Sequence, residues 1–275
     1  MKKVDISTVI LILASILGLS LLVYPIIGRY INASTHGNIV SQYTQQTAQS
    51  ENYYKGMLDA ADDFNKRLLT RKNPYTLGKE LQTLYDDMVN PFNNGIMGYI
   101  EIPELDRTLP IYHSTSDSVL SAGIGHLEWT SLPVGGESTH SVISGHRGLT
   151  GTELFNDLDR LAIGDVFTLQ MLGKVLTYQV DQILVVEPND IDDLTIVEGE
   201  DYCTLVTCTP YRINSHRLLV RGTRIENIVN TKKLVSDIDQ IGNSTVAICI
   251  GAPLFIVFNI VSIMEDRRRY GGAKH

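Results

Sequence analysis

Three side chains of this sequence, Cys208, His146 and Arg217, could together break and remake an acyl bond. An unperturbed thiol has a pKa of about 8.5, so only a small fraction is the attacking thiolate at neutral pH. An imidazole titrates near neutrality, so His146 could hold the cysteine's proton and later protonate a leaving amine. Arg217 cannot be that acid because its charge is permanent, but its fork of donors suits a substrate carbonyl or an oxyanion.

Each of these residues also has a simpler interpretation. A single cysteine in an apolar strand is usually a small buried hydrophobe. His146 lies between glycines and could be a turn residue, and Arg217 could be a surface cation. Arg221 falls on the same strand face as Arg217, so spacing alone does not choose between the two arginines.

The motif TLVTC at 204–208 runs on into TPY at 209–211 and INSHRLLVRG at 213–222. This block resembles the active-site block of sortases, the membrane-anchored cysteine transpeptidases of Gram-positive bacteria. Two upstream motifs, GHLEWTSLPVGG at 125–136 and HSVISGHRG at 140–148, are similar to the histidine block of the same family. The likeness is nearest to class C, the pilin polymerases, and it covers residues 70–265.

The resemblance implies a role for individual residues. Cys208 would be the nucleophile, His146 the general acid, and Arg217, directly before the apolar LLV, the substrate and oxyanion partner. The substrate groove beside the cysteine would include Thr207, Thr209 and Pro210.

The implied reaction exchanges one amide bond for another. Cys208 would attack the carbonyl between Thr and Gly of an LPxTG-like sorting signal, and His146 would protonate the departing glycine amine. A lysine amine of a neighbouring pilin would then resolve the thioester into an isopeptide bond, whereas water would make the site a protease. The expected partners are pilin subunits with such signals and acceptor lysines, and no cofactor or metal is expected.

Two other functions remain open. A sortase that attaches proteins to peptidoglycan is disfavoured by the C-terminal apolar stretch and by a segment similar to a lid. An inactive sortase-like scaffold that holds pilins is disfavoured because all three catalytic candidates are present. A papain-like hydrolase is less consistent still, because its order of Cys before His and its local signature are absent.

The pattern of apolar residues after Gly95 predicts a β domain. Short apolar alternations separated by turn residues predict strands at 97–102, 108–112, 141–144, 166–172, 175–186, 202–208 and 218–225. This series is typical of an antiparallel all-β barrel or sandwich, and the resemblance narrows it to a closed sortase-type β-barrel with short helices. Alternation puts Thr204, Val206 and Cys208 on one strand face, with the thiol aimed into a groove, and Cys203 on the other, where it simply packs.

Residues 36–72 are polar and helix-prone, and they carry one apolar face. Their apolar positions at three-and-four spacing are Met57, Leu58, Ala61, Phe64 and Leu68. This pattern predicts an amphipathic helix that covers the protein's own core, the commoner alternative to docking of a partner helix.

Asn73, Pro74 and Tyr75 lie between this helix and the barrel. Class C sortases carry a lid here, typically Asp-Pro-aromatic, whose aspartate meets the arginine and whose ring covers the cysteine. Asparagine brings no charge, so such a lid would be held more weakly. The triplet at 90–92 is a second candidate, and both could be ordinary Asn-Pro turns.

Both ends of the chain carry uncharged apolar stretches. Residues 6–28 are long enough to cross about 30 Å of hydrocarbon as a helix, with a cleaved signal peptide as the alternative. Residues 245–264 predict a second crossing in spite of an internal glycine and proline, with a buried soluble helix as the alternative. Basic residues flank both stretches on their outer sides, so the positive-inside tendency places both ends in the cytoplasm.

The predicted organisation is therefore a two-pass protein of the cell membrane with its catalytic domain on the extracellular face. Its parts are a cytoplasmic end at 1–5, a transmembrane helix at 6–28, an extracellular helical extension with a possible lid at 29–95, the catalytic β-barrel at 96–228, a linker at 229–244, a transmembrane helix at 245–264 and a basic cytoplasmic tail at 265–275.

Composition excludes some classes of function and of site. The net charge of −8 comes without a basic stripe, so nucleic-acid binding has no support. No disulfide is expected, because Cys249 falls in a predicted span and an extended strand separates the other two cysteines by about 16 Å. The acidic residues between 190 and 200 match no calcium-loop spacing and are typical of a solvated loop.

Overall fold

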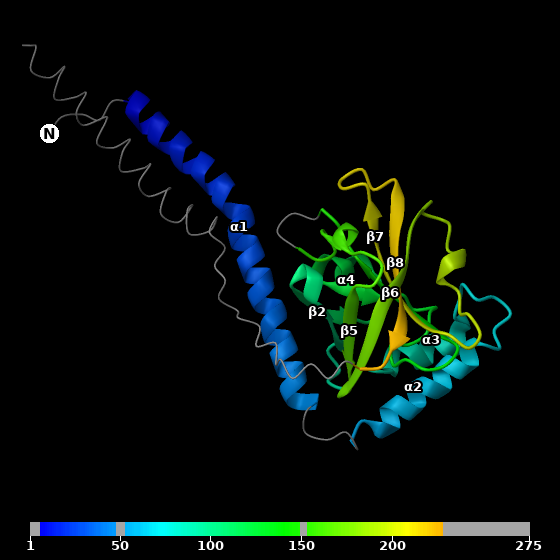
Figure 1. The fold of residues 1–275 in the computed structure, drawn as a ribbon. Helices are drawn as coiled ribbons and strands as arrows, with labels where there is room; N and C mark the ends of the chain where they lie inside the picture. The colour runs from blue at the N-terminus through cyan, green and yellow to red at the C-terminus, as the bar shows by residue number, and fades with distance from the viewer. Residues whose placement is uncertain (1–5, 48–52, 149–152, 228–275) are drawn as a thin grey trace, which may run out of the picture. The chain divides into compact units, whose positions relative to one another are not determined.

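The computed structural model describes residues 6–47, 53–148 and 153–227. Its described residues from Ala33 onward form one compact unit, and those before Ala33 belong to another. The elements in chain order are α1 (Ile6–Thr47), α2 (Lys55–Leu68), α3 (Gly78–Asp87), β1 (Ile96–Ile102), η1 (Pro103–Leu105), β2 (Arg107–Tyr112), α4 (Asp117–Ala122), β3 (Ile124–His126), β4 (Thr139–Gly145), η2 (Leu158–Arg160), β5 (Val166–Met171), β6 (Lys174–Val186), η3 (Asp192–Leu194), β7 (Asp201–Thr209) and β8 (His216–Ile225) (Figure 1).

The strands form a closed barrel in the order β1-β2-β3-β4-β7-β8-β6-β5, which confirms the predicted barrel fold. Most neighbours are antiparallel, but β2 with β3 and β4 with β7 are parallel. Side chains fill the interior of a barrel of this size, and β5 shows the alternation: Phe167, Leu169 and Met171 are buried, and the residues between them are partly exposed.

Each of the seven predicted strands overlaps a strand of the barrel. The prediction missed β3, because three residues in a glycine-containing stretch are too short to show a period of two. It also implied an all-antiparallel sheet, which was wrong for two pairs: strand direction depends on how the chain crosses over, and alternation does not record this.

Helices α2 and α3 pack against the barrel and share its core. Ala61, Phe64 and Leu68 of α2 are buried in one apolar cluster with Tyr85 of α3 and with barrel residues. The buried Asn65 side chain also joins α2 to the β3–β4 connection: its Nδ2 donates to the Leu132 carbonyl at 3.1 Å, and its Oδ1 accepts from the Leu132 N–H at 2.7 Å. The predicted amphipathic face is confirmed, although the helix-prone stretch 36–72 is divided between the end of α1 and α2.

Helix α1 begins at Ile6, within the predicted span 6–28, and continues to Thr47. It is the only helix in the described part of the chain that is long and apolar enough to cross a membrane. Near its end, the Tyr43 hydroxyl donates to the Met97 carbonyl at 2.7 Å and accepts from the Leu172 N–H at 2.8 Å, which attaches this turn to β1 and to the end of β5. The predicted linker, second span and basic tail, from 229 onward, lie outside the described residues.

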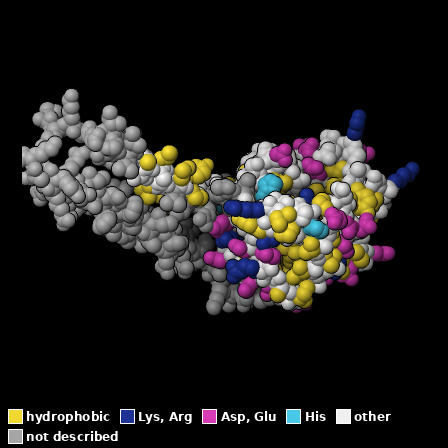
Figure 2. All heavy atoms as spheres, turned by 90° about the horizontal axis from the view of Figure 1, so that it is seen from above, with side chains coloured by type: hydrophobic (Ala, Val, Ile, Leu, Met, Phe, Trp, Pro, Cys, Tyr) yellow, Lys and Arg dark blue, Asp and Glu magenta, His cyan; other side chains and the backbone are white. Residues whose placement is uncertain are grey.

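The surface of the barrel mixes charges of both signs. Figure 2 shows acidic and basic side chains interspersed over the face it presents, with apolar side chains between them. No basic stripe is seen on this face of the described residues.

Candidate active site

The ends of β4, β7 and β8 bring the three candidate residues together. In the antiparallel pair of β7 and β8, Cys208 lies directly opposite Arg217. In the parallel pair of β4 and β7, Ser144 lies opposite Val206, so His146 follows β4 at the level at which Cys208 follows Val206. All three side chains are half-buried, as accessible reactive groups must be.

The register separates the two arginines that spacing could not. Arg221 lies opposite Thr204, at a distance from the cysteine, and its Nε and Nη2 donate to the Asp181 carboxylate at 3.1 and 2.7 Å. Its guanidinium also lies 4.1 Å from the centre of the Tyr202 ring. Asp181 raises the pKa of Arg221 and neutralises its charge.

Arg217 has different partners. Its Nη1 donates to the backbone carbonyls of Asn214 at 3.4 Å and His216 at 3.1 Å. No carboxylate of the described residues lies within ion-pair distance of it. The charge opposite Cys208 is therefore available to a ligand, which is what an oxyanion partner requires.

Two polar contacts align the strand ends around the thiol. The buried Thr207 hydroxyl donates to the Gly145 carbonyl at 2.7 Å, so it joins β7 to β4 one residue before both Cys208 and His146. Thr207 is 2% exposed, whereas Thr209 is half-buried and Pro210 is exposed. Of the three residues expected in the groove, only Thr209 and Pro210 therefore have accessible side chains.

The second of these contacts comes from Arg147, next to His146, a residue to which sequence reasoning assigned no role. Its Nε donates to the Asn156 carbonyl at 3.0 Å, and its Nη2 pairs with Asp159 at 2.5 Å. Its Nη1 donates to the Thr209 hydroxyl at 3.4 Å, one residue after Cys208. Arg147 thus joins the histidine turn to the end of the cysteine strand, and its position within SGHRG was the signal that could have identified it.

The second cysteine of the barrel differs from Cys208 in access. Cys203 is fully buried in the core, as strand alternation predicted. Burial first, and then the nearby Asp201 carboxylate, raises the pKa of the Cys203 thiol well above its usual range. Cys203 is therefore unreactive, and Cys208 is the accessible thiol of the described barrel.

An apolar surface lies on the outer side of β4, β7 and β8 and leads toward Cys208. Val142 and Leu219 are buried there beneath Leu194 of η3, and Val206 and Trp129 pack against the same cluster. The connection between β6 and β7, which contains η3, therefore forms a roof over this face; we call residues 191–195 the roof segment.

His140 fastens this roof segment to the strands. Its Nδ1 lies 2.8 Å from the Thr195 carbonyl and its Nε2 lies 2.7 Å from the Thr204 hydroxyl. A carbonyl can only accept, so Nδ1 carries the proton and Nε2 accepts from Thr204. Burial lowers the pKa of His140 to about 4, which keeps the ring neutral. Apart from the place of His140 in HSVISGHRG, no sequence signal pointed to this role.

Of the three predicted lid residues, Tyr75 contacts the roof segment, and it also contacts Trp129. Asn73 Oδ1 accepts from the Tyr75 N–H at 2.9 Å. Tyr75 donates its hydroxyl to Asp192 Oδ1 at 2.8 Å, and its ring meets Trp129 edge to face with centroids 5.7 Å apart. No hydrogen bond, ion pair or ring contact joins Asn73 or Tyr75 to the three candidate catalytic residues in the described chain.

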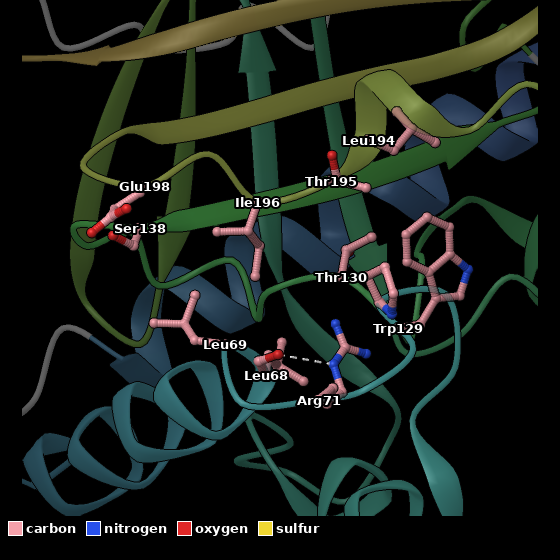
Figure 3. Close-up of a pocket in the computed structure, with 11 residues that line it drawn as sticks. Leu68, Leu69, Arg71, Trp129, Thr130, Ser138, Leu194, Thr195, Ile196 and Glu198 are labelled. Carbon is pink, nitrogen blue, oxygen red and sulfur yellow. Dashed lines mark hydrogen bonds between the residues drawn. The ribbon is translucent and has the colours of Figure 1, made fainter.

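A cavity of about 640 Å³ lies between the segment after α2 and the roof segment. Figure 3 shows Arg71, Trp129 and Leu194 around it.

The second Asn-Pro candidate, at 90–92, lies away from this cavity. Phe92 packs edge to face on Tyr43 of α1, with centroids 5.7 Å apart, and Asn90 Oδ1 accepts from the Gly95 N–H at 3.0 Å.

Comparisons with known proteins find a matching family model and similar structures. A family model described as Sortase domain matches residues 100–225. Sortase C1 from Streptococcus agalactiae is 47% identical, with a TM-score of 0.66 over 70% of this chain and 100% of that chain. Sortase C from Streptococcus pneumoniae is 44% identical, with a TM-score of 0.61 over 69% and 97%.

A third structure, Clostridium perfringens sortase C with the C-terminal cell wall sorting motif, is 43% identical, with a TM-score of 0.60 over 69% of this chain and 99% of that one. Matches to curated sortases span 48%, 41% and 61% of those proteins, so this chain aligns with about half of their length. Because the chain matches the Sortase domain model and is 47% identical to a sortase structure that it covers over its whole length, it belongs to the sortase family of cysteine transpeptidases.

Proposed function

We propose that this sortase cleaves an LPxTG-like sorting signal between Thr and Gly and transfers the acyl group to a lysine amine of a pilin subunit. The strand register supports this most directly, because it places Cys208 opposite Arg217 and level with His146. The similarity to a pneumococcal sortase C described in terms of pilin substrate specificity supports the choice of acceptor. So does the similarity to a sortase C that holds a sorting motif.

In the first half-reaction, the Cys208 thiolate attacks the threonine carbonyl carbon, and the imidazolium of His146 stabilises the thiolate. The carbonyl electrons move to oxygen, where the Arg217 guanidinium stabilises the negative charge. The intermediate collapses, the bond to glycine breaks, and His146 gives its proton to the departing amine. A thioester on Cys208 remains.

In the second half-reaction, a lysine amine attacks the thioester carbonyl and loses a proton to His146. The C–S bond breaks, Cys208 leaves as the thiolate, and an isopeptide bond joins two subunits. Water follows the same route to a free carboxylate, so the relative access of amine and water decides between polymer and fragment.

Mass spectrometry of the full-length chain in detergent tests this reaction. The chain is incubated with an LPxTG peptide and then with a lysine-bearing pilin fragment or a stem-peptide amine. We expect an adduct on Cys208 that lacks the residues from glycine onward and then passes to the pilin lysine. The Cys208→Ala variant should form no adduct, and Cys249→Ala, a cysteine control outside the predicted barrel, should form it normally.

The acceptor separates the remaining candidates. Transfer to the stem-peptide amine but not to the pilin lysine would identify a sortase that attaches proteins to peptidoglycan. The absence of any adduct would contradict this substrate class and favour the scaffold.

We further infer that the chain crosses the membrane at 6–28 and at 245–264, with residues 29–95 and the barrel at 96–228 on the extracellular face. The apolar α1 supports the first crossing. Protease treatment of intact protoplasts should digest the barrel and leave epitope tags at both chain ends protected. Loss of the C-terminal tag together with the barrel would contradict the second crossing.

A further inference from the structure

The segment between α2 and α3 forms a closed turn that is fixed to the end of α2. Arg71 Nε donates to the Leu68 carbonyl at 3.1 Å, and its Nη1 donates to the Thr76 carbonyl at 3.2 Å. Within the turn, Asn73 Oδ1 is occupied by the Tyr75 N–H. Because Leu68 is buried in the core, its bond to Arg71 fixes the position of the turn that carries Tyr75.

Both partners of the Tyr75 side chain lie at the apolar surface on the outer side of β4, β7 and β8. Asp192, which receives the hydroxyl at 2.8 Å, is the first residue of η3 in the roof segment. Trp129, which meets the ring edge to face, packs against the apolar cluster on the outer side of β4, β7 and β8. Tyr75 thus joins the anchored turn to the roof segment and to Trp129.

The roof segment has a second attachment at its last residue, Thr195. The Thr195 carbonyl accepts from His140, which also bonds Thr204 of β7. Between the two attachments, Leu194 is 5% exposed and lies on Val142 and Leu219. Thr204, Val206 and Cys208 share one strand face, and the roof segment covers the Thr204 end of it. The position of the roof segment therefore sets how much of this face stays open beside the thiol, where the substrate groove is expected.

We propose that Tyr75 is a positioning residue that braces the roof segment through Asp192 and Trp129 and so shapes the groove, rather than a cover over Cys208. The inference rests on the proposed function in one respect, that the groove receives the sorting signal. The hydrogen bond to Asp192 and the ring contact with Trp129 hold the roof segment, and the Cys208 thiol stays accessible.

The experiment uses the full-length chain in detergent with four single variants. Tyr75→Phe removes only the hydroxyl and keeps the ring on Trp129. Asp192→Ala removes the acceptor, and Asp192→Asn keeps an oxygen that can accept the same bond. Lys72→Ala changes an exposed side chain of the same turn and is the matched control.

The first measurement needs no substrate. Hydrogen exchange of the roof amides, including the Leu194 and Thr195 N–H groups bonded to the Ile191 and Asp192 carbonyls, should accelerate severalfold in Tyr75→Phe and Asp192→Ala. Exchange should match wild type in Asp192→Asn and Lys72→Ala. Unchanged exchange of the roof amides in both Tyr75→Phe and Asp192→Ala would overturn the brace.

The second measurement distinguishes a brace from a cover, and it adds the truncation Tyr75→Ala. The rate at which iodoacetamide alkylates Cys208, assigned by peptide mass, should change less than about twofold in this variant, because the ring contacts Trp129. A tenfold acceleration would instead show that Tyr75 shields the thiol, and would overturn the proposal.

The third measurement uses a quenched LPxTG peptide. KM should rise roughly threefold to tenfold in Tyr75→Phe and in Asp192→Ala, the range expected for one exposed hydrogen bond, with little change in kcat. The double variant should be no worse than either single variant, because both remove the same bond. A fall in kcat at constant KM would contradict a role in substrate positioning.

Failure of the proposed function has a different signature. If the wild-type chain does not cleave the peptide, the substrate class is wrong, and the exchange and alkylation results still decide whether Tyr75 braces the roof segment.

Discussion

At the scale of single residues, the site depends on which charges are already neutralised. Arg221 donates two hydrogen bonds to Asp181 and lies over the Tyr202 ring. Arg217, opposite Cys208, bonds only backbone carbonyls within the described chain. A guanidinium that is already paired with a carboxylate is not available to stabilise the negative charge that develops on a reacting oxygen. Substitutions of these two arginines should therefore have different effects.

Lysine substitutions test this difference. Arg217→Lys should lower kcat/KM for an LPxTG peptide by roughly a hundredfold or more, as loss of an oxyanion donor does. Arg221→Lys should lower the free energy of unfolding by about 1–2 kcal/mol, through loss of a bidentate pair, and leave kcat/KM of the folded enzyme nearly unchanged. Peptide cleavage rates and urea titrations measure the two effects, and equal losses of activity would contradict the assignment.

Arg147 should act on catalysis through His146. Arg147→Ala removes the contacts to Asn156, Asp159 and Thr209, so the histidine turn should lose its fixed position beside the thiol. We expect kcat to fall about tenfold or more with little change in KM, and partial recovery in Arg147→Lys.

The measurement is the pH profile of kcat, whose acid and base limbs should shift in Arg147→Ala if the pairing of Cys208 and His146 changes. Arg160→Ala, an exposed neighbour of Asp159, is the matched control. A uniform fall in rate with an unchanged profile would indicate a purely structural role.

At the scale of elements, the parallel pair of β4 and β7 positions both the candidate active site and the roof segment. His140 of β4 bonds Thr204 of β7 and the Thr195 carbonyl of the roof segment, so one imidazole joins three segments. It can do so only as the neutral tautomer, because imidazolium would lose its bond from Thr204.

The stability of this contact should therefore depend on pH. Burial lowers the folded-state pKa of His140 from an ordinary value of about 6.5 to about 4. Between these values the unfolded chain binds a proton that the folded chain excludes, so the free energy of unfolding should fall as pH decreases from 6.5 toward 4. The buried His126, whose pKa is lowered to about 3, contributes in the same direction.

Urea unfolding between about pH 7 and pH 4.5, followed by fluorescence of the single tryptophan, measures this slope. His140→Asn should be less stable at neutral pH but should lose less stability on acidification. The physical reason is that each pKa unit between the folded and unfolded states corresponds to about 1.4 kcal/mol, and the variant lacks this contribution. An identical slope in the variant would show that His140 is not the titrating group.

At the scale of the whole molecule, the helical extension and the barrel form one core. Phe64 of α2 is 1% exposed and lies 6.3 Å, between ring centroids, from Tyr85 of α3. Asn65 satisfies both backbone groups of Leu132 in the β3–β4 connection. The extension should therefore unfold together with the barrel.

Phe64→Ala should lower the free energy of unfolding by about 3–5 kcal/mol, the cost of a cavity left by a buried phenylalanine. Leu69→Ala, just after the end of α2 and 51% exposed, should stay within about 0.5 kcal/mol of wild type. Circular dichroism and Trp129 fluorescence during urea unfolding should give coincident transitions. A separate early transition for the helices would contradict a common core.

Features that depend on local pattern could be predicted from the amino-acid sequence alone. Strand positions follow from alternation with a period of two, and the buried face of α2 follows from helical spacing, because both patterns are repeated within a few residues. The site residues Cys208, His146 and Arg217 were proposed from short motifs, and alternation along the strand of Cys208 also predicted that Cys203 faces the core.

Features that depend on partners distant in the chain required the tertiary structure. The parallel pairing of β4 with β7, and the fact that Arg217 rather than Arg221 lies opposite Cys208, are properties of register. The bond from Tyr75 to Asp192 spans 117 positions. Alternation shows which face a side chain occupies but not which strand or loop faces it, because those pairings are set by how the whole chain closes the barrel.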